Sequence, residues 1–115
     1  MNNRAPRIDP CQRRYERLLQ SLAAVGYISQ GSVLDRSTLH PPRSGYQWTR
    51  KIGGRTTTVA LSAEQFKALH KAIENRRRLR KTISQMETLS RRILFKNLPD
   101  TRRRKPLRRK VLGTI

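Results

Sequence analysis

Acidic residues and cysteine are scarce in this sequence, and each scarcity argues against a class of functional site. The seven Asp and Glu residues are scattered along 115 positions, so no pair of carboxylates suggests acid–base catalysis or metal-dependent phosphoryl transfer. Cys11 is the only cysteine, which excludes a disulfide within the chain; with only His40 and His70 to help, it argues against a metal site. We therefore expect a protein that is not an enzyme, with no catalytic residues, no metal and no cofactor.

Long apolar runs are also missing. No stretch approaches the roughly 18 apolar residues needed to span a bilayer, and the segment MNNRAPRIDP lacks the apolar centre of a secretory signal. We expect no membrane partner and an intracellular location.

Positive charge is the abundant feature. Lys and Arg number 27, the formal net charge is +20 and the isoelectric point is about 11.8. The positive charges of a compact chain with this composition repel one another. Binding to a phosphate polymer is favourable for such a chain, because each cation that contacts a phosphate releases condensed counterions. We expect nucleic acid as the main partner, with DNA and RNA both open.

The N-terminal part predicts a basic arm over residues 1–8 and a helix over residues 9–26. Asp9 and Pro10 suit the N-cap and the first helical position, and Gly26 suits the end of a helix. The expected apolar face of this helix consists of Tyr15, Leu18, Leu19, Leu22 and Val25.

From Gly31 onward the pattern favours strands, and Gly53–Gly54 between YQWTRKI and RTTTVAL predicts a tight hairpin. Such pairing places Trp48 opposite Val59 and Tyr46 opposite Leu61 on one face. The other face would carry Gln47, Thr49, Lys51, Thr56 and Thr58. We expect Trp48 and Tyr46 to cover a core rather than to stack on bases.

A capping box at Ser62 and Gln65 predicts the start of a helix of more than thirty residues that runs to about Phe95, because Pro99 bars much further extension. Its apolar stripe changes face, from Phe66, Leu69 and Ile73 to Leu79, Ile83, Met86, Leu89 and Ile93. The first half should cover the hairpin. The second half needs a different surface, either the N-terminal helix or the same helix of a second subunit.

Five basic residues lie within six positions where the apolar stripe changes face. They are Arg76, Arg77, Arg78, Arg80 and Lys81, here named the arginine collar. Glu74, four residues before Arg78, offers one ion pair. Arginine favours bidentate contact with phosphate, so we predict that the collar binds phosphates. Further nucleic-acid contacts are predicted at Arg50, Lys51 and Arg55 of the hairpin and at Arg102, Arg103, Arg104, Lys105, Arg108, Arg109 and Lys110. Any sequence specificity would come from Gln47, Thr49 and Lys51 or from a partner protein.

These elements predict an α+β fold with a short N-terminal helix, a three-stranded antiparallel β-meander, a long C-terminal helix and an extended basic tail. The hairpin and long helix would form one domain over residues 31–98, and the tail would occupy residues 99–115.

The stretches GSVLDR, YQWTRKIGGRTTTVALS and IENRRRLRKTISQMETLSRRIL resemble a family of small, uncharacterised bacterial proteins found beside mobile elements. Members share a GSV strand, a hairpin ending in GRT.TV.L and a long helix with EN.RRLR; the resemblance covers about Gly31 to Leu94. The family's cysteine-rich loop, which looks like a zinc knuckle, is replaced here by TLHPPRSG. The resemblance implies an accessory role beside transposition machinery in the bacterial cytoplasm or nucleoid.

The function expected from the sequence is therefore that of a nucleic-acid-binding accessory protein within a larger protein or nucleoprotein complex. One alternative is a structural RNA-binding subunit of a ribonucleoprotein. The other is a protein adaptor that forms a homodimer through Ile83, Met86, Leu89 and Ile93.

Overall fold

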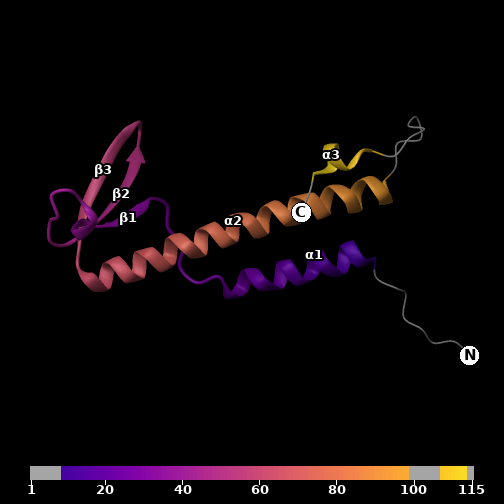
Figure 1. The fold of residues 1–115 in the computed structure, drawn as a ribbon. Helices are drawn as coiled ribbons and strands as arrows, with labels where there is room; N and C mark the ends of the chain where they lie inside the picture. Colours follow the sequence, from indigo (N-terminus) through magenta and orange to yellow (C-terminus); the bar gives the residue numbers. More distant parts are fainter. Residues whose placement is uncertain (1–8, 99–106, 114–115) are drawn as a thin grey trace, which may run out of the picture. The chain divides into compact units, whose positions relative to one another are not determined.

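The computed structural model describes residues 9–98 and 107–113 and has the predicted α+β architecture. In chain order the elements are α1 (Pro10–Ser21), η1 (Leu22–Ala24), β1 (Ser32–Asp35), η2 (Arg36–Thr38), β2 (Tyr46–Ile52), β3 (Arg55–Leu61), α2 (Ala63–Asn97) and α3 (Arg109–Leu112), as labelled in Figure 1. Two compact units divide the chain: residues 25–79 form one, and residues 1–24 with 80–115 belong to the other. The boundary between the two units therefore falls inside α2.

Helix α1 begins as the sequence predicts. Asp9 is its N-cap: the carboxylate Oδ1 accepts a hydrogen bond of 2.9 Å from the backbone N–H of Cys11, and Pro10 occupies the first helical position. The helix ends earlier than expected, at Ser21, and the tighter turn of η1 continues to Ala24.

The three strands form an antiparallel meander in the order β1-β2-β3. The register confirms the predicted pairs of Trp48 with Val59 and of Tyr46 with Leu61, and Ile52 pairs with Arg55 across the Gly53–Gly54 turn. Strand β1 adds Val33 beside Trp48. One face of the sheet is therefore largely apolar at its centre, as predicted.

Helix α2 follows β3 after one intervening residue, Ser62. The predicted capping box is present: the Ser62 hydroxyl accepts from the Gln65 N–H at 3.1 Å, and Gln65 Oε1 accepts from the Ser62 N–H at 2.9 Å. The helix spans 35 residues and ends at Asn97, two residues before Pro99. Both the length and the C-terminal limit confirm the prediction.

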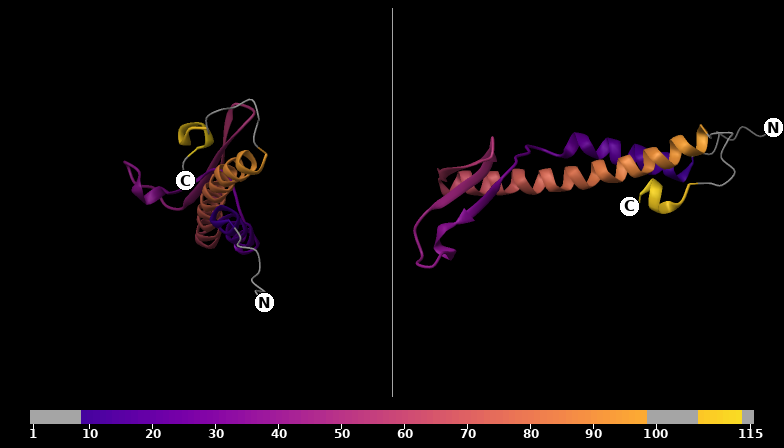
Figure 2. Two further views of the ribbon diagram at one scale, coloured as in Figure 1. Left: turned by 90° about the vertical axis from the view of Figure 1, so that its right-hand side faces the viewer. Right: turned by 90° about the horizontal axis from the view of Figure 1, so that it is seen from above.

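In the unit of residues 25–79, the sheet meets the start of α2 through one aromatic contact at the base of the hairpin. The Tyr46 ring stacks on Phe66 with centroids 4.5 Å apart, and Ile73 is only 6% exposed. The helix therefore contacts the base of the hairpin, as predicted, but does not cover its whole apolar face, because Val59 and Ile52 are 43% and 48% exposed. The sheet and the start of α2 are seen from two further directions in Figure 2.

In the other unit, α1 lies beside the second half of α2 with opposite chain direction (Figures 1 and 2). Lys96 Nζ lies 2.8 Å from Asp9 Oδ2 at one end. Leu89, on the α2 stripe, is 1% exposed. The sequence left two partners open for the second half of α2, the N-terminal helix and a second subunit; in the structure, the N-terminal helix α1 lies beside it.

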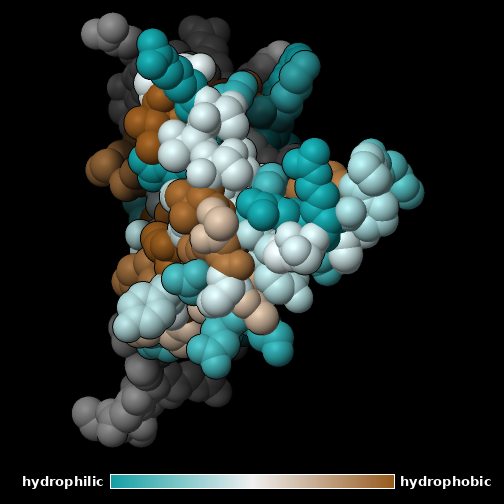
Figure 3. Space-filling view, turned by 90° about the vertical axis from the view of Figure 1, so that its left-hand side faces the viewer, coloured by the Kyte–Doolittle hydropathy of each residue, from teal (hydrophilic) through white to brown (hydrophobic). Residues whose placement is uncertain are grey.

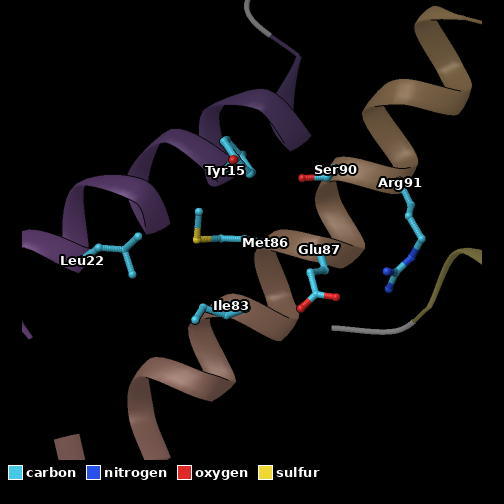
Figure 4. A pocket seen from close by; sticks show the side chains of 7 residues that line it. All are labelled: Tyr15, Leu22, Ile83, Met86, Glu87, Ser90 and Arg91. Carbon is cyan, nitrogen blue, oxygen red and sulfur yellow. The ribbon is translucent and has the colours of Figure 1, made fainter. Parts of the chain in front are cut away.

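A cleft of about 340 Å³ remains between α1 and this half of α2, and in Figure 4 the Tyr15 and Met86 side chains lie between the two helices. Its lining consists of Tyr15, Leu22, Ile83, Met86, Glu87, Ser90 and Arg91. Ile83 keeps 42% of its surface exposed, so α1 covers the stripe only in part.

The basic tail was expected to be extended, but four of its residues form the helical turn α3. This turn is held by α2: Arg91 Nε donates to the carbonyl of Leu112 at 2.6 Å, and Arg92 Nη2 donates to the carbonyl of Gly113 at 3.4 Å. Two guanidinium groups thus satisfy carbonyls at the end of α3, where helical acceptors lack partners within the helix.

Candidate nucleic-acid interface

Three collar arginines, Arg76, Arg77 and Arg78, belong to the unit of residues 25–79. Successive helical residues are rotated by about 100°, so these side chains leave α2 in three directions. Arg77 Nη1 forms an ion pair of 2.8 Å with Glu74 Oε1, and the two side chains are 70% and 42% exposed. The ion pair between Glu74 and Arg78 expected from the sequence is wrong, because Glu74 pairs with Arg77 instead.

Arg78 instead donates from Nη2 to Asn75 Oδ1 at 2.5 Å. Asn75 is 6% exposed, and its Nδ2 donates to the backbone carbonyl of Tyr27 at 2.9 Å. The carboxamide of Asn75 therefore joins an arginine of the collar to Tyr27, which lies 48 residues before Asn75 in the chain.

The remaining collar cations have no hydrogen-bond or ion-pair partner within residues 9–98 and 107–113. Arg76 is half-buried, whereas Arg80 and Lys81, which belong to the other unit, are exposed. A guanidinium offers five N–H donors that need acceptors, and water or phosphate can supply them. These three side chains are the collar members best able to accept a new anionic ligand.

The register separates the predicted hairpin cations onto two faces. Arg50 lies on the Trp48 face, with its guanidinium carbon 5.9 Å from the Trp48 ring centroid, and its buried Nε has no partner among the described residues. Arg55 shares that face at the turn, whereas Lys51 lies on the opposite face with Thr49. Both Lys51 and Arg55 are exposed.

The polar residues proposed for sequence specificity are partly occupied within the sheet. Gln47 Oε1 accepts from Arg36 Nε at 3.3 Å, and the hydroxyl groups of Thr49 and Thr58 lie 3.4 Å apart. Only Lys51 of that set extends freely from the part of the chain that the structure describes.

Among the predicted tail residues, Arg108, Arg109 and Lys110 are exposed: Arg108 precedes α3 as its N-cap and the other two lie in its first turn. Arg102, Arg103, Arg104 and Lys105 lie outside the described residues.

The aromatic side chains divide between packing and exposure. Tyr46 is stacked on Phe66, and Trp48 Nε1 donates to the carbonyl of Gln30 at 2.9 Å, so both serve the fold as expected. Tyr27, by contrast, is 92% exposed. Tyr27 was not singled out from the sequence; its signal is a lone aromatic residue directly after Gly26, in a stretch without strand or helix periodicity.

Asn75 was also missed, although the sequence holds a clue to it. It stands three residues after Ala72 and four before Leu79, which is a position for an apolar residue on the helix stripe. A polar residue there is buried only if its side chain finds hydrogen-bond partners, and the partners come from Tyr27 and Arg78.

The electrostatic environment of two carboxylates is resolved. The hydrogen bond from Lys96, followed by that from the Cys11 N–H, holds the pKa of Asp9 below its ordinary value of 3.8. The backbone N–H of Ser37 similarly lowers the pKa of Asp35, which caps η2. Both acids therefore hold local structure, and neither forms an ion pair with a collar arginine.

Apolar and hydrophilic side chains share the molecular surface shown in Figure 3. Among the described residues, no helix has the length and apolar character to cross a membrane. Within the same residues, no group of three or more His, Cys, Asp or Glu side chains is placed to hold a metal ion.

Comparisons with known proteins return no relative: no family model matches this chain, and neither does any curated protein or solved structure.

Proposed function

We propose that this chain is an accessory protein that binds nucleic acid, chiefly through its phosphates. The observation that carries the proposal is uncompensated charge. The whole chain has a formal net charge of +20, yet the residues that the structure describes contain two ion pairs, Arg77 with Glu74 and Lys96 with Asp9. Both pairs lie at exposed positions, where solvent screens them and the contribution to stability is small.

The distribution of the free cations also supports a polyanion. Arg76, Arg80 and Lys81 have no partner within the described residues, and exposed basic groups recur on the hairpin and on α3. A single small anion would need few of these groups, whereas a phosphate chain can engage many and release a counterion at each contact. The proposed place in mobile-element machinery rests on the family resemblance of Gly31 to Leu94 alone.

The test is salt-dependent binding to a labelled oligonucleotide. If six cations contact phosphate, affinity should fall on the order of 10³-fold between 50 and 200 mM salt. The variant Arg76→Gln/Arg80→Gln should lower the salt slope by about two contacts and keep its melting temperature, because neither side chain has a described partner and Gln is a good helix former.

A matched control removes the same charge elsewhere. Arg13→Gln/Arg17→Gln likewise replaces two helical arginines that have no partner in the part of the chain described; both are exposed, whereas Arg76 is half-buried. If both double variants change the slope equally, binding is generic attraction and the collar has no special role. A flat salt response of the unchanged protein would refute phosphate binding itself.

The dimeric adaptor is the second candidate, and the exposed fraction of Ile83 favours it. Ile83 and Met86 line a cleft that α1 leaves open, so a second copy could cover them. Sedimentation before and after nuclease treatment separates the two candidates, because an adaptor keeps its assembly when nucleic acid is destroyed.

A further inference from the structure

The segment that follows η1 is fastened to α2 by its backbone. The N–H of Ser29 donates to the carbonyl of Ala72 at 3.2 Å, and Asn75 Nδ2 donates to the carbonyl of Tyr27 at 2.9 Å. Ala72 and Asn75 are 7% and 6% exposed, so this attachment is shielded from water. The position of Tyr27 is thus set by α2 and not by the segment alone.

The side chain of Tyr27 takes no part in this attachment. It is 92% exposed, the largest fraction among the six aromatic residues, all of which the structure describes. Exposure of an aromatic ring to water is unfavourable, and a ring held on an ordered backbone loses little further freedom when a ligand covers it.

The same asparagine that holds Tyr27 also holds an arginine. Asn75 Oδ1 accepts from Arg78, so the backbone carbonyl of Tyr27 and the guanidinium of Arg78 are bound to the two ends of one carboxamide. Arg76 and Arg77 are the adjoining residues of α2. An exposed aromatic residue and an arginine attached to the same asparagine supply the two kinds of contact that single strands use, because bases stack on aromatic rings while phosphates meet cations.

We propose that Tyr27 is a stacking platform for an unpaired base, so that the preferred ligand is single-stranded nucleic acid. This inference rests on the proposed function and specifies its substrate. A duplex presents phosphates to the collar but keeps the faces of its bases covered by their neighbours. Only an unpaired base has a free face to offer to the Tyr27 ring.

The experiment measures the affinity of the full chain for three labelled probes of equal length: oligothymidine, a duplex, and an abasic phosphodiester oligomer. Tyr27→Ala should weaken oligothymidine binding about 5- to 100-fold and leave binding of the duplex and the abasic oligomer unchanged. Tyr27→Phe should bind like the unchanged protein, because it keeps the ring. Ile28→Ala, a neighbouring apolar residue that is 51% exposed, is the matched control and should have little effect.

Each outcome has one meaning. If no probe binds, the proposed function fails. If all probes bind and Tyr27→Ala changes none of them, phosphate binding stands and the stacking platform is refuted. An equal loss on all three probes would also refute stacking, since the abasic oligomer has no base. Thermal melting of Tyr27→Ala should match that of the unchanged protein, because the ring it removes contacts mainly solvent; a lower melting temperature would contradict the exposed position of the ring.

Discussion

Replacement of Gly31 by alanine should destabilise the sheet by considerably more than a change in backbone preference alone. Gly31 has φ +99°, and a Cβ at this position would stand 2.5 Å from Trp48 Nε1 and 2.6 Å from the carbonyl oxygen of Thr49. The Thr49 oxygen belongs to β2, in the pair of Thr49 with Ser32, so it cannot retreat without disturbing the β1–β2 ladder.

The expected cost has two parts. A non-glycine residue in a sparsely populated backbone region costs about 1–3 kcal/mol. Displacement of Trp48 breaks its hydrogen bond to the Gln30 carbonyl, worth about 0.5–1.5 kcal/mol more. A loss of about 1.5–4.5 kcal/mol would lower the melting temperature by roughly 6 °C or more in a small domain.

Gly54→Ala is the matched control. Gly54 also has a positive φ, +79°, but no neighbouring atom lies within 4 Å of the position that a Cβ would take, so alanine there meets backbone strain without a clash. Circular dichroism would follow melting, and the fluorescence of Trp48, the single tryptophan, would report its environment. If Gly31→Ala has the same melting temperature as Gly54→Ala, and the fluorescence emission of its Trp48 is unchanged, the close approach of Gly31 to Trp48 is wrong.

Two further predictions concern the unit that contains α1. Asp9→Asn keeps an N-cap but loses the charge; because the pKa of Asp9 is lowered in the fold, its stabilisation is complete above the ordinary value of 3.8 and is lost as pH falls through the folded pKa. The melting temperature of Asp9→Asn should therefore lie below that of the unchanged protein at about pH 7, and the gap should close in acid; a gap independent of pH would contradict the ion pair with Lys96. Leu89→Ala should cost about 2–5 kcal/mol in denaturant unfolding, since Leu89 is 1% exposed, whereas Ile83→Ala, at 42% exposed, should cost clearly less. Equal costs would contradict the difference in burial between Leu89 and Ile83.

Features set by local chemistry were predictable from the sequence. Asp9 and Pro10 begin α1, Ser62 and Gln65 begin α2, and Gly53–Gly54 fixes the hairpin register. In each case the interacting groups are a few residues apart, so spacing alone specifies the geometry.

Features that depend on distant partners were not predictable. Glu74 forms its ion pair with Arg77 and not with Arg78, because Arg78 is hydrogen-bonded to Asn75. Asn75 is in turn oriented by its hydrogen bond to the Tyr27 carbonyl. The turn α3 likewise owes its place to Arg91 and Arg92, which a pattern of charge marks only as cations. The charges of the candidate interface are therefore predictable from the sequence, and the contacts that arrange them are not.

The junction between β3 and α2 sets a rule for changes in chain length. Only Ser62 separates Leu61, the last residue of β3, from Ala63, the first residue of α2. The orientation of the strand therefore determines which direction each residue at the start of the helix faces. Insertion of one residue between Leu61 and Ala72 would turn all later helical positions by about 100° relative to the sheet. Asn75 would then face away from the Tyr27 carbonyl, even though every interacting side chain was still present. Length variation can be absorbed at the exposed hairpin turn of Gly53–Gly54, but not along this connection, where the number of residues determines whether Asn75 meets the Tyr27 carbonyl.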